Sequence, residues 1–231
     1  MKSLTSKARL AGFLYLLTGI PSVFYLIYIP SAFIVPGDVT ATADRIMASE
    51  ALFRLGVVSE LLSATSFIFV VLALYDLLRD VNRRQAVLMV TLFAISVPIS
   101  FVNVLNQIAV LKFLGGTGLL SVFDKAQQDA LAMVFVGLHG YGVIVAQIFW
   151  GLWLAPFGML VFRSGFIPPV LGILLMISCV SYVSASVTVL LFPSAHMVSE
   201  YMMGPAGFGE LAMILWLLIK GARVQPSAAP A

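Results

Sequence analysis

The sequence predicts an all-α, polytopic membrane protein, a bundle of about six transmembrane helices with both termini in the cytoplasm. Three observations support this fold class. First, 61% of the residues are hydrophobic and only 10% are charged, whereas roughly a quarter of the residues of a soluble domain are charged. Second, the sequence contains long apolar runs, and a membrane span needs about 20 such residues. Third, basic residues are dense in alternate connections and sparse in the others.

The predicted spans fill most of the chain and are joined by short connections. They cover residues 10–29, 55–78, 86–111, 131–162, 167–191 and 202–219. We therefore expect a single membrane domain over residues 1–223, followed by a disordered tail at 224–231. The first apolar run exceeds the roughly 7–15 residues of a signal-peptide core, so we expect it to be retained as a span.

The distribution of basic residues predicts the orientation. With the N-terminus inside, the cytoplasmic segments contain all the Lys and Arg residues except Arg45, Arg54, Lys112 and Lys125. By the positive-inside rule, both termini are then cytoplasmic. The net charge of +3 is scattered over helix ends and forms no basic patch, so we expect the lipid bilayer, and no nucleic acid, as a partner. A protein partner or a homo-oligomer is left open.

Two connections have readable local chemistry. Between the fourth and fifth spans, Gly165 is suited to ending one helix, and Pro168 and Pro169 are suited to starting the next. We expect these two spans to form a tight antiparallel hairpin. In the first outer loop, residues 40–54 carry apolar side chains at helical spacing, which predicts a short amphipathic surface helix.

The fourth span is longer than a membrane requires. Its 32 residues, 131–162, would extend about 48 Å as a helix, against a hydrocarbon core of about 30 Å. The span must therefore tilt, bend or project outward. Pro156 and several glycines, including Gly151, supply places for a bend.

Polar residues inside the spans are the candidates for a binding site, since burying them in a membrane is costly. The candidate pocket comprises Glu60, Asn103, Gln107, His139, Gln147 and Glu210. Counted along the helices, Glu60, Asn103, Gln107 and His139 lie near the outer interface, where water could reach them. Asn103 and Gln107 are one turn apart, so their amides could also simply hold helices together.

Glu210 is predicted to lie deepest in the bilayer, about 15 Å from Lys220 along the helix. No Lys or Arg lies within the apolar runs to pair with it. We therefore expect Glu210 to be neutral or hydrogen-bonded to a partner such as His139, Gln147 or Asn103. Gly204, Pro205, Gly207 and Gly209 suggest that the sixth span starts late or is broken just before it.

The sequence contains no complete catalytic, nucleotide-binding or metal-binding motif, and it identifies no cofactor. The single cysteine, Cys179, allows neither an intramolecular disulfide nor a cysteine-based metal cluster. His139, Glu60 and Glu210 could together hold a metal, but they lack paired ligand spacing on one helix. We predict no metal site and no catalytic residue.

Several stretches resemble a known family. They include residues 34–38 and 48–56, Asn103 with Asn106 and Gln107, residues 138–153 and 163–166, and Gly209 with Glu210. In these stretches the chain resembles the bacterial membrane-protein family numbered 4386 among the domains of unknown function. The resemblance implies a multi-pass protein of the bacterial inner membrane, and it implies no established activity.

These observations lead to three hypotheses for function. In the first, the bundle encloses an outward-facing polar pocket that binds or transports a small ligand or a proton. In the second, the protein is a structural or regulatory membrane subunit without a ligand of its own. In the third, it is an intramembrane enzyme or metal-binding protein that uses His139 and Glu210.

Overall fold

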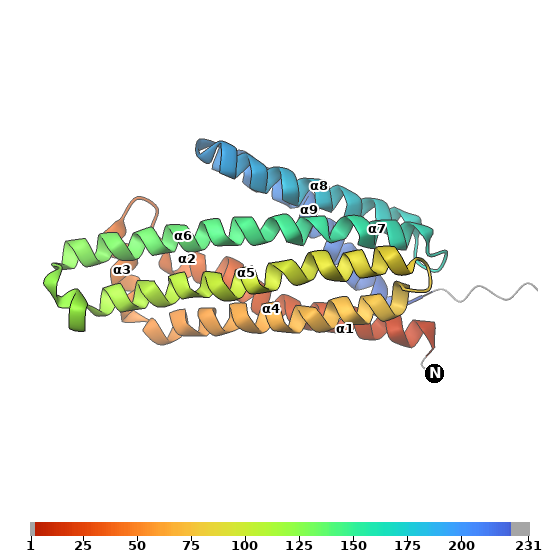
Figure 1. Ribbon diagram of the computed structural model, residues 1–231, viewed down its shortest axis with the longest axis horizontal. Helices are drawn as coiled ribbons and strands as arrows, with labels where there is room; N and C mark the ends of the chain where they lie inside the picture. Colours follow the sequence, from red (N-terminus) through yellow and green to blue (C-terminus); the bar gives the residue numbers. More distant parts are fainter. Residues whose placement is uncertain (1–2, 223–231) are drawn as a thin grey trace, which may run out of the picture. The chain divides into compact units, whose positions relative to one another are not determined.

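The computed structural model describes residues 3–222, and it is all-α over this range, with no strand (Figure 1). The predicted tail at 224–231 lies outside the described residues. The helices are α1 (Leu4–Val23), the π-helix η1 (Phe24–Tyr28), α2 (Ile29–Phe33), α3 (Val39–Ala48), α4 (Glu50–Leu78), α5 (Arg83–Gly115), the 3₁₀ helix η2 (Gly118–Val122), α6 (Lys125–Leu152), α7 (Leu154–Arg163), α8 (Pro169–Leu191), the 3₁₀ helix η3 (Pro193–Ala195) and α9 (His196–Ile219).

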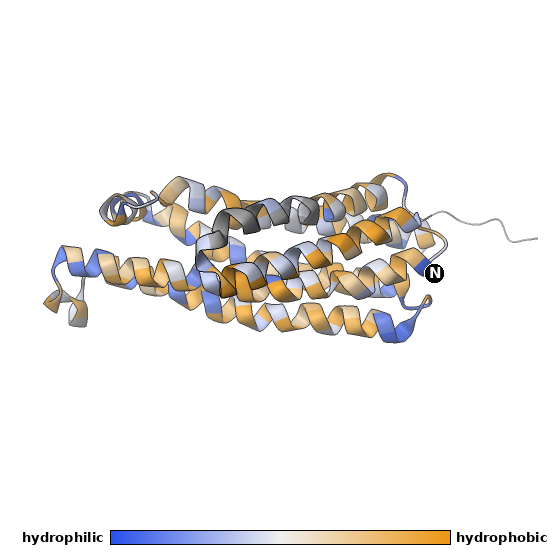
Figure 2. Ribbon diagram, turned by 90° about the horizontal axis from the view of Figure 1, so that it is seen from above, coloured by the Kyte–Doolittle hydropathy of each residue, from blue (hydrophilic) through white to orange (hydrophobic). Residues whose placement is uncertain are grey.

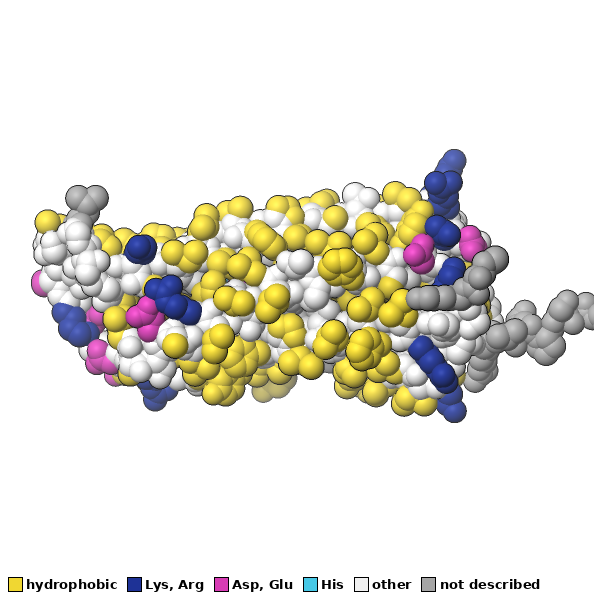
Figure 3. All heavy atoms as spheres, turned by 90° about the horizontal axis from the view of Figure 1, so that it is seen from below, with side chains coloured by type: hydrophobic (Ala, Val, Ile, Leu, Met, Phe, Trp, Pro, Cys, Tyr) yellow, Lys and Arg dark blue, Asp and Glu magenta, His cyan; other side chains and the backbone are white. Residues whose placement is uncertain are grey.

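Five described helical segments are long and apolar enough to cross a membrane. They are Leu4–Phe33, Glu50–Leu78, Arg83–Gly115, Lys125–Arg163 and Pro169–Leu191. A shorter apolar helix, Gly207–Ile219, occupies the end of the sixth predicted span. Hydrophobic residues dominate these helices (Figure 2), and many large hydrophobic side chains are exposed, as the face in Figure 3 illustrates. These features are those of an integral membrane protein.

The chain folds into two compact units, and α1, α4, α5 and α6 contribute a segment to each. The first unit comprises residues 1–17, 66–96 and 147–231, and the second comprises residues 18–65 and 97–146. We name the second the α3 unit and the first the α8 unit, after helices that lie wholly within each. The single domain expected from the sequence stays a prediction.

The α3 unit contains an irregular first span. Pro30 has no N–H to donate, and the backbone upstream of it forms the π-helix η1, in which the Ile29 N–H donates to the Phe24 carbonyl five residues before. The predicted surface helix is present as α3, and Asp38 caps its first turn by accepting the Ala41 N–H at 2.8 Å. Residues 50–54, the end of that predicted helix, belong instead to α4.

The core of the α3 unit is apolar and lies beneath α3. Ile46 of α3 packs with Ile29 and Phe33 of α2, with Phe53 of α4 and with Val110 of α5. On the surface, Lys125 of α6 forms an ion pair with Asp44 of α3 at 3.1 Å. Exposed ion pairs of this kind contribute about 0–1 kcal/mol, so buried Ile46 is the stronger anchor of α3.

The α8 unit contains an irregularity in the fourth span, for which the sequence predicts a tilt, a bend or an outward projection. The helix is interrupted at Trp153, between α6 and α7. Pro156 explains the position, because it cannot donate to the carbonyl of Leu152 four residues earlier and its ring crowds that carbonyl. Trp153 is buried at the break, where its ring stacks on Phe157 and meets Tyr15, Phe67 and Phe93.

The predicted hairpin between the fourth and fifth spans is also present in the α8 unit. Gly165 adopts a positive φ of 72°, which favours glycine, and α8 begins with Pro169 at its first position. The final helix differs from the expectation. The helix α9 begins at His196 and continues without a break through Gly204 and Gly209 to Ile219.

Candidate functional site

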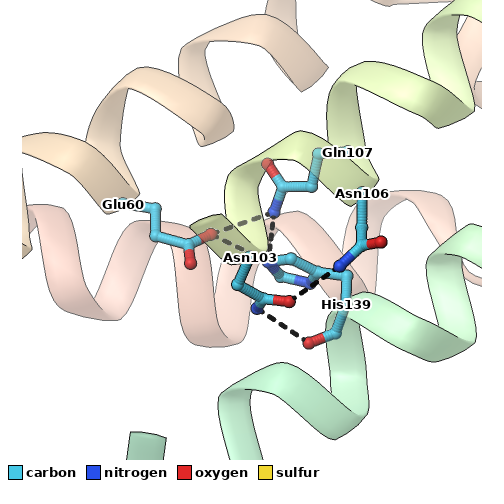
Figure 4. Close-up of polar contacts among 5 residues, drawn as sticks. All are labelled: Glu60, Asn103, Asn106, Gln107 and His139. Carbon is cyan, nitrogen blue, oxygen red and sulfur yellow. Dashed lines mark hydrogen bonds and ion pairs between the residues drawn. The ribbon is translucent and has the colours of Figure 1, made fainter. Parts of the chain in front are cut away.

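The structure brings four of the six predicted site residues together within the α3 unit. Glu60 lies on α4, Asn103 and Gln107 on α5, and His139 on α6, and their side chains point toward one another (Figure 4). Gln147 and Glu210 belong to the α8 unit. The α3 unit therefore contains a polar cluster assembled from three long helices.

Three atoms of this cluster lie within mutual hydrogen-bonding distance. The Nε2 atom of His139 is 2.8 Å from Glu60 Oε2 and 2.7 Å from Gln107 Nε2. Gln107 Nε2 in turn donates to Glu60 Oε2 at 3.1 Å. We call Glu60, Gln107 and His139 the Glu60 cluster. These contacts join three helices. Along the chain, Gln107 is 47 residues from Glu60, and His139 is 79 residues from Glu60.

Two members of the Glu60 cluster are buried within the protein, and the third, His139, is partly exposed, with 18% of its side chain accessible. Glu60 is 2% exposed and Gln107 is 7% exposed, although the depth estimate had placed both near the interface, within reach of water. Polar groups buried this way need hydrogen-bond partners, and the carboxyl, imidazole and amide supply them to one another.

Asn103 fixes α6 against α5 next to the cluster. Its Nδ2 donates to the backbone carbonyl of His139 at 2.9 Å, and its Oδ1 accepts from Asn106 Nδ2 at 3.0 Å. Gly142, one turn after His139, makes room for this arrangement, because a Cβ there would overlap the Asn103 amide. Asn103 thus has the interhelical role that its position in a span predicts.

The variant Gly142→Ala is expected to displace the Asn103 amide and to lower the free energy of unfolding by about 1–3 kcal/mol. Gly140→Ala is the matched control, since a Cβ at Gly140 meets no atom within 4 Å. That change should instead stabilise α6 by up to about 1 kcal/mol through helix propensity. Unfolding by sodium dodecyl sulfate in mixed micelles measures both, and equal effects of the two variants would contradict the packing role of Gly142.

A small cavity of about 50 Å³ adjoins the Glu60 cluster, enough space for a few water molecules. Gln107 and His139 form its polar side. The remaining lining residues are Tyr25, Ile29, Pro30, Phe33, Ile34, Ile46, Phe53, Val110 and Val136. Most of the lining side chains are apolar. The cavity therefore suits a small apolar ligand that carries one polar group.

One polar atom of Gln107, a residue that lines this cavity, has no hydrogen-bond partner. Gln107 Oε1 is buried, and within residues 3–222 nothing donates to it. An amide oxygen buried without a donor costs about 1–3 kcal/mol. A ligand or water molecule that donates a hydrogen bond would remove this cost.

Tyr25 also lines the cavity, although it is not among the site residues predicted from the sequence. It lies on η1 and is buried, and it is close enough to Glu60 to interact with its charge. The available signal was the pair Pro21 and Pro30, which disturb the first span on both sides of Tyr25. A π-helical turn changes the helical periodicity. The direction in which Tyr25 points could therefore not be predicted from the spacing of residues in an α-helix.

Glu210 lies in a second polar cluster, within the α8 unit. Tyr15 on α1 donates its hydroxyl to Glu210 Oε2, and Tyr182 on α8 donates to Oε1 at 2.8 Å. From the sequence we expect a partner such as His139, Gln147 or Asn103, whereas the structure shows two tyrosines. Tyrosine hydroxyls are common in apolar spans and carry no spacing signal toward Glu210.

The described part of the chain contains no group of three His, Cys, Asp or Glu side chains arranged to hold a metal ion. Glu60 and His139 are in contact, yet Gln107, a weak ligand, is the third member of their cluster. The Glu60 cluster can accept and donate protons through its carboxyl and imidazole. Its chemistry therefore favours hydrogen bonding and proton binding.

The chain matches the family described as "Domain of unknown function (DUF4386)" over residues 10–221. It is also similar to an uncharacterized protein of Archaeoglobus fulgidus, with 32% identity over 155 residues, which cover 67% of this chain and 76% of that relative. No solved structure matches the chain. Because the family match includes every predicted span and both polar clusters, the protein belongs to the DUF4386 family of domains of unknown function.

Proposed function

We propose that this membrane protein binds a small, mostly apolar ligand in the cavity beside Gln107 and His139. The observation that carries the proposal is the buried, unpartnered Gln107 Oε1 at an otherwise apolar cavity. A ligand with one O–H or N–H group would satisfy this oxygen while its hydrocarbon part contacts Ile29, Phe33 and Val136. Binding or transport of such a ligand is the function that the site supports best.

We further propose that the protein lies in the bacterial inner membrane with both termini in the cytoplasm. The asymmetry of Lys and Arg between alternate connections supports this orientation. In this orientation α3 and the connection between α5 and α6 are on the outer side, and the cavity beneath α3 is nearer to that side. The ligand would then enter from outside the cell.

Ethanol and dimethyl ether form a matched pair of probes small enough for this cavity, since they are isomers and only ethanol carries a hydroxyl donor. We expect ethanol to raise the unfolding temperature of the purified protein more than dimethyl ether does, because only ethanol donates to Gln107 Oε1. The unfolding temperature is read from tryptophan fluorescence. All three tryptophans, Trp150, Trp153 and Trp216, lie in the α8 unit, away from the residues that line the cavity.

Two variants separate cavity binding from partition of the probes into micelles. Val136→Phe fills the cavity and should abolish the response to both probes. Gln107→Leu removes the acceptor and should make the responses to ethanol and dimethyl ether equal. Equal responses of the wild-type protein and Val136→Phe would show that the probes act through the micelle and would refute the proposal.

A further inference from the structure

Tyr25 brings a second polar group without a hydrogen-bond partner to the cavity. Its side chain, on η1, is 7% exposed and forms part of the cavity wall. The hydroxyl interacts with the charge of Glu60, but within the described residues it forms no hydrogen bond. A hydroxyl buried without a partner is costly, so a ligand that accepts its hydrogen would be favoured.

The Tyr25 hydroxyl lies toward the polar side of the cavity. An interaction with the charge of Glu60 requires the phenol oxygen to be near that carboxyl. The same carboxyl is 3.1 Å from Gln107 Nε2 and 2.8 Å from His139 Nε2. Gln107 and His139 form the polar side of the cavity. The unpartnered hydroxyl is therefore at the same end of the cavity as Gln107.

Tyr25 and Gln107 have complementary requirements for a ligand. Gln107 Oε1 is an amide oxygen, which can only accept a hydrogen bond, and the Tyr25 hydroxyl has one hydrogen to donate. The hydroxyl of an alcohol satisfies both groups at once, because its oxygen accepts one hydrogen bond and donates another. An ether oxygen can only accept, and an ammonium group can only donate.

The rest of the cavity limits the ligand to one polar group. Its other lining side chains are mostly apolar, as Ile29, Phe33 and Val136 are. A second polar group on the ligand would lie against hydrocarbon and lose its hydrogen bonds to water. The volume of about 50 Å³ also restricts the ligand to a few non-hydrogen atoms.

We propose that the Tyr25 hydroxyl is a ligand-binding group and that, together with Gln107, it selects a small uncharged alcohol. This inference rests on the proposed function and narrows its ligand to molecules that both accept and donate one hydrogen bond. Tyr25 donates to the alcohol oxygen, and Gln107 Oε1 accepts the alcohol hydrogen. Tyr25 is then the residue that distinguishes an oxygen-containing ligand from a plain hydrocarbon.

Propane, dimethyl ether and ethanol test this assignment, because they are of nearly the same size. Propane forms no hydrogen bond, dimethyl ether only accepts, and ethanol accepts and donates. The dependence of the unfolding temperature on probe concentration gives the dissociation constants for the full-length protein in micelles. Tyr25→Phe should weaken the binding of ethanol and of dimethyl ether about 2- to 10-fold, as expected for one hydrogen bond, and should not weaken that of propane. Comparing proteins probe by probe cancels the different hydration of the probes.

Tyr28→Phe is the matched control. Tyr28 lies on the same π-helix but is 48% exposed, and it is not among the residues that line the cavity. This variant should leave the dissociation constants of all the probes unchanged. Tyr25→Phe should also leave the unfolding temperature without probe unchanged or higher, because the lost hydroxyl has no partner. A lower value would show that the hydroxyl is already hydrogen-bonded, for example to a bound water molecule, and would overturn the proposal.

The remaining outcomes separate this inference from the proposed function. If Gln107→Leu changes the response to ethanol but Tyr25→Phe weakens neither oxygen-containing probe, the cavity binds ligands and Tyr25 is not a binding group. An equal loss for all the probes, propane included, would mean that Tyr25 acts only through the shape of its ring. If Val136→Phe leaves every response unchanged, the proposed function fails, and the alcohol class fails with it.

Discussion

The double variant Tyr15→Phe/Tyr182→Phe is expected to lose about 3 kcal/mol or more of the free energy of unfolding, because it removes both donors to Glu210. Ordinary interhelical hydrogen bonds in membrane proteins contribute only about 0.6 kcal/mol on average. Two such bonds would account for little over 1 kcal/mol. The larger value is expected because the variant leaves a carboxyl in an apolar span without partners.

A third substitution separates this explanation from simple loss of packing. Adding Glu210→Met to the double variant removes the stranded carboxyl and should recover most of the lost free energy. Sodium dodecyl sulfate titration, followed by circular dichroism, measures the three proteins. A double variant that loses less than about 1 kcal/mol, or a triple variant less stable than the double, would mean that the tyrosines are not needed to stabilise Glu210.

The second large effect is expected where α7 and α8 meet. Gly158 and Gly172 approach so closely that a Cβ on Gly158 would lie 2.6 Å from the Gly172 carbonyl oxygen, and a Cβ on Gly172 would lie 2.5 Å from the Gly158 oxygen. Backbone atoms cannot rotate away as a flexible side chain does. Gly158→Ala/Gly172→Ala should therefore force the helices apart and cost about 3 kcal/mol or more.

Gly204→Ala/Gly207→Ala is the matched control for this pair. Both glycines lie on α9, and a Cβ at either position meets no atom within 4 Å. Each alanine should stabilise the helix by up to about 1 kcal/mol. We therefore expect the two double variants to differ in their free energy of unfolding. Similar values for both would contradict the close contact of α7 with α8.

The ends of the helices show the limits of prediction from apolar runs. The second span was predicted from residue 55, whereas α4 begins at Glu50, and the last was predicted from residue 202, whereas α9 begins at His196. Helical hydrogen bonding continues into polar residues such as Glu50 and Arg54, which form an i, i+4 pair outside the apolar run. Hydropathy detects the part of a helix that suits lipid, and the backbone extends further.

The sequence predicts which polar residues are candidates for the site, but it predicts only some of the contacts between them. Asn103 and Gln107 are one turn apart on one helix, so their common face follows from periodicity alone. Their contacts with His139, and the contact of His139 with Glu60, depend on how separate helices are rotated about their axes. The tyrosine partners of Glu210 and the presence of Tyr25 at the cavity depend on the same rotations.

The sequence alone determined that this chain is an all-α membrane protein, that its fourth span is longer than a bilayer requires and carries Pro156 as a place for a bend, and that the fourth and fifth spans form a hairpin. These properties follow from composition, from Pro156 and from the Gly165 to Pro169 connection, each of which acts locally. Only the tertiary structure decided which polar side chains meet and that a cavity lies beside Gln107 and His139. Helices of nearly uniform hydrophobicity give little indication of which face turns inward, so packing between helices sets those contacts.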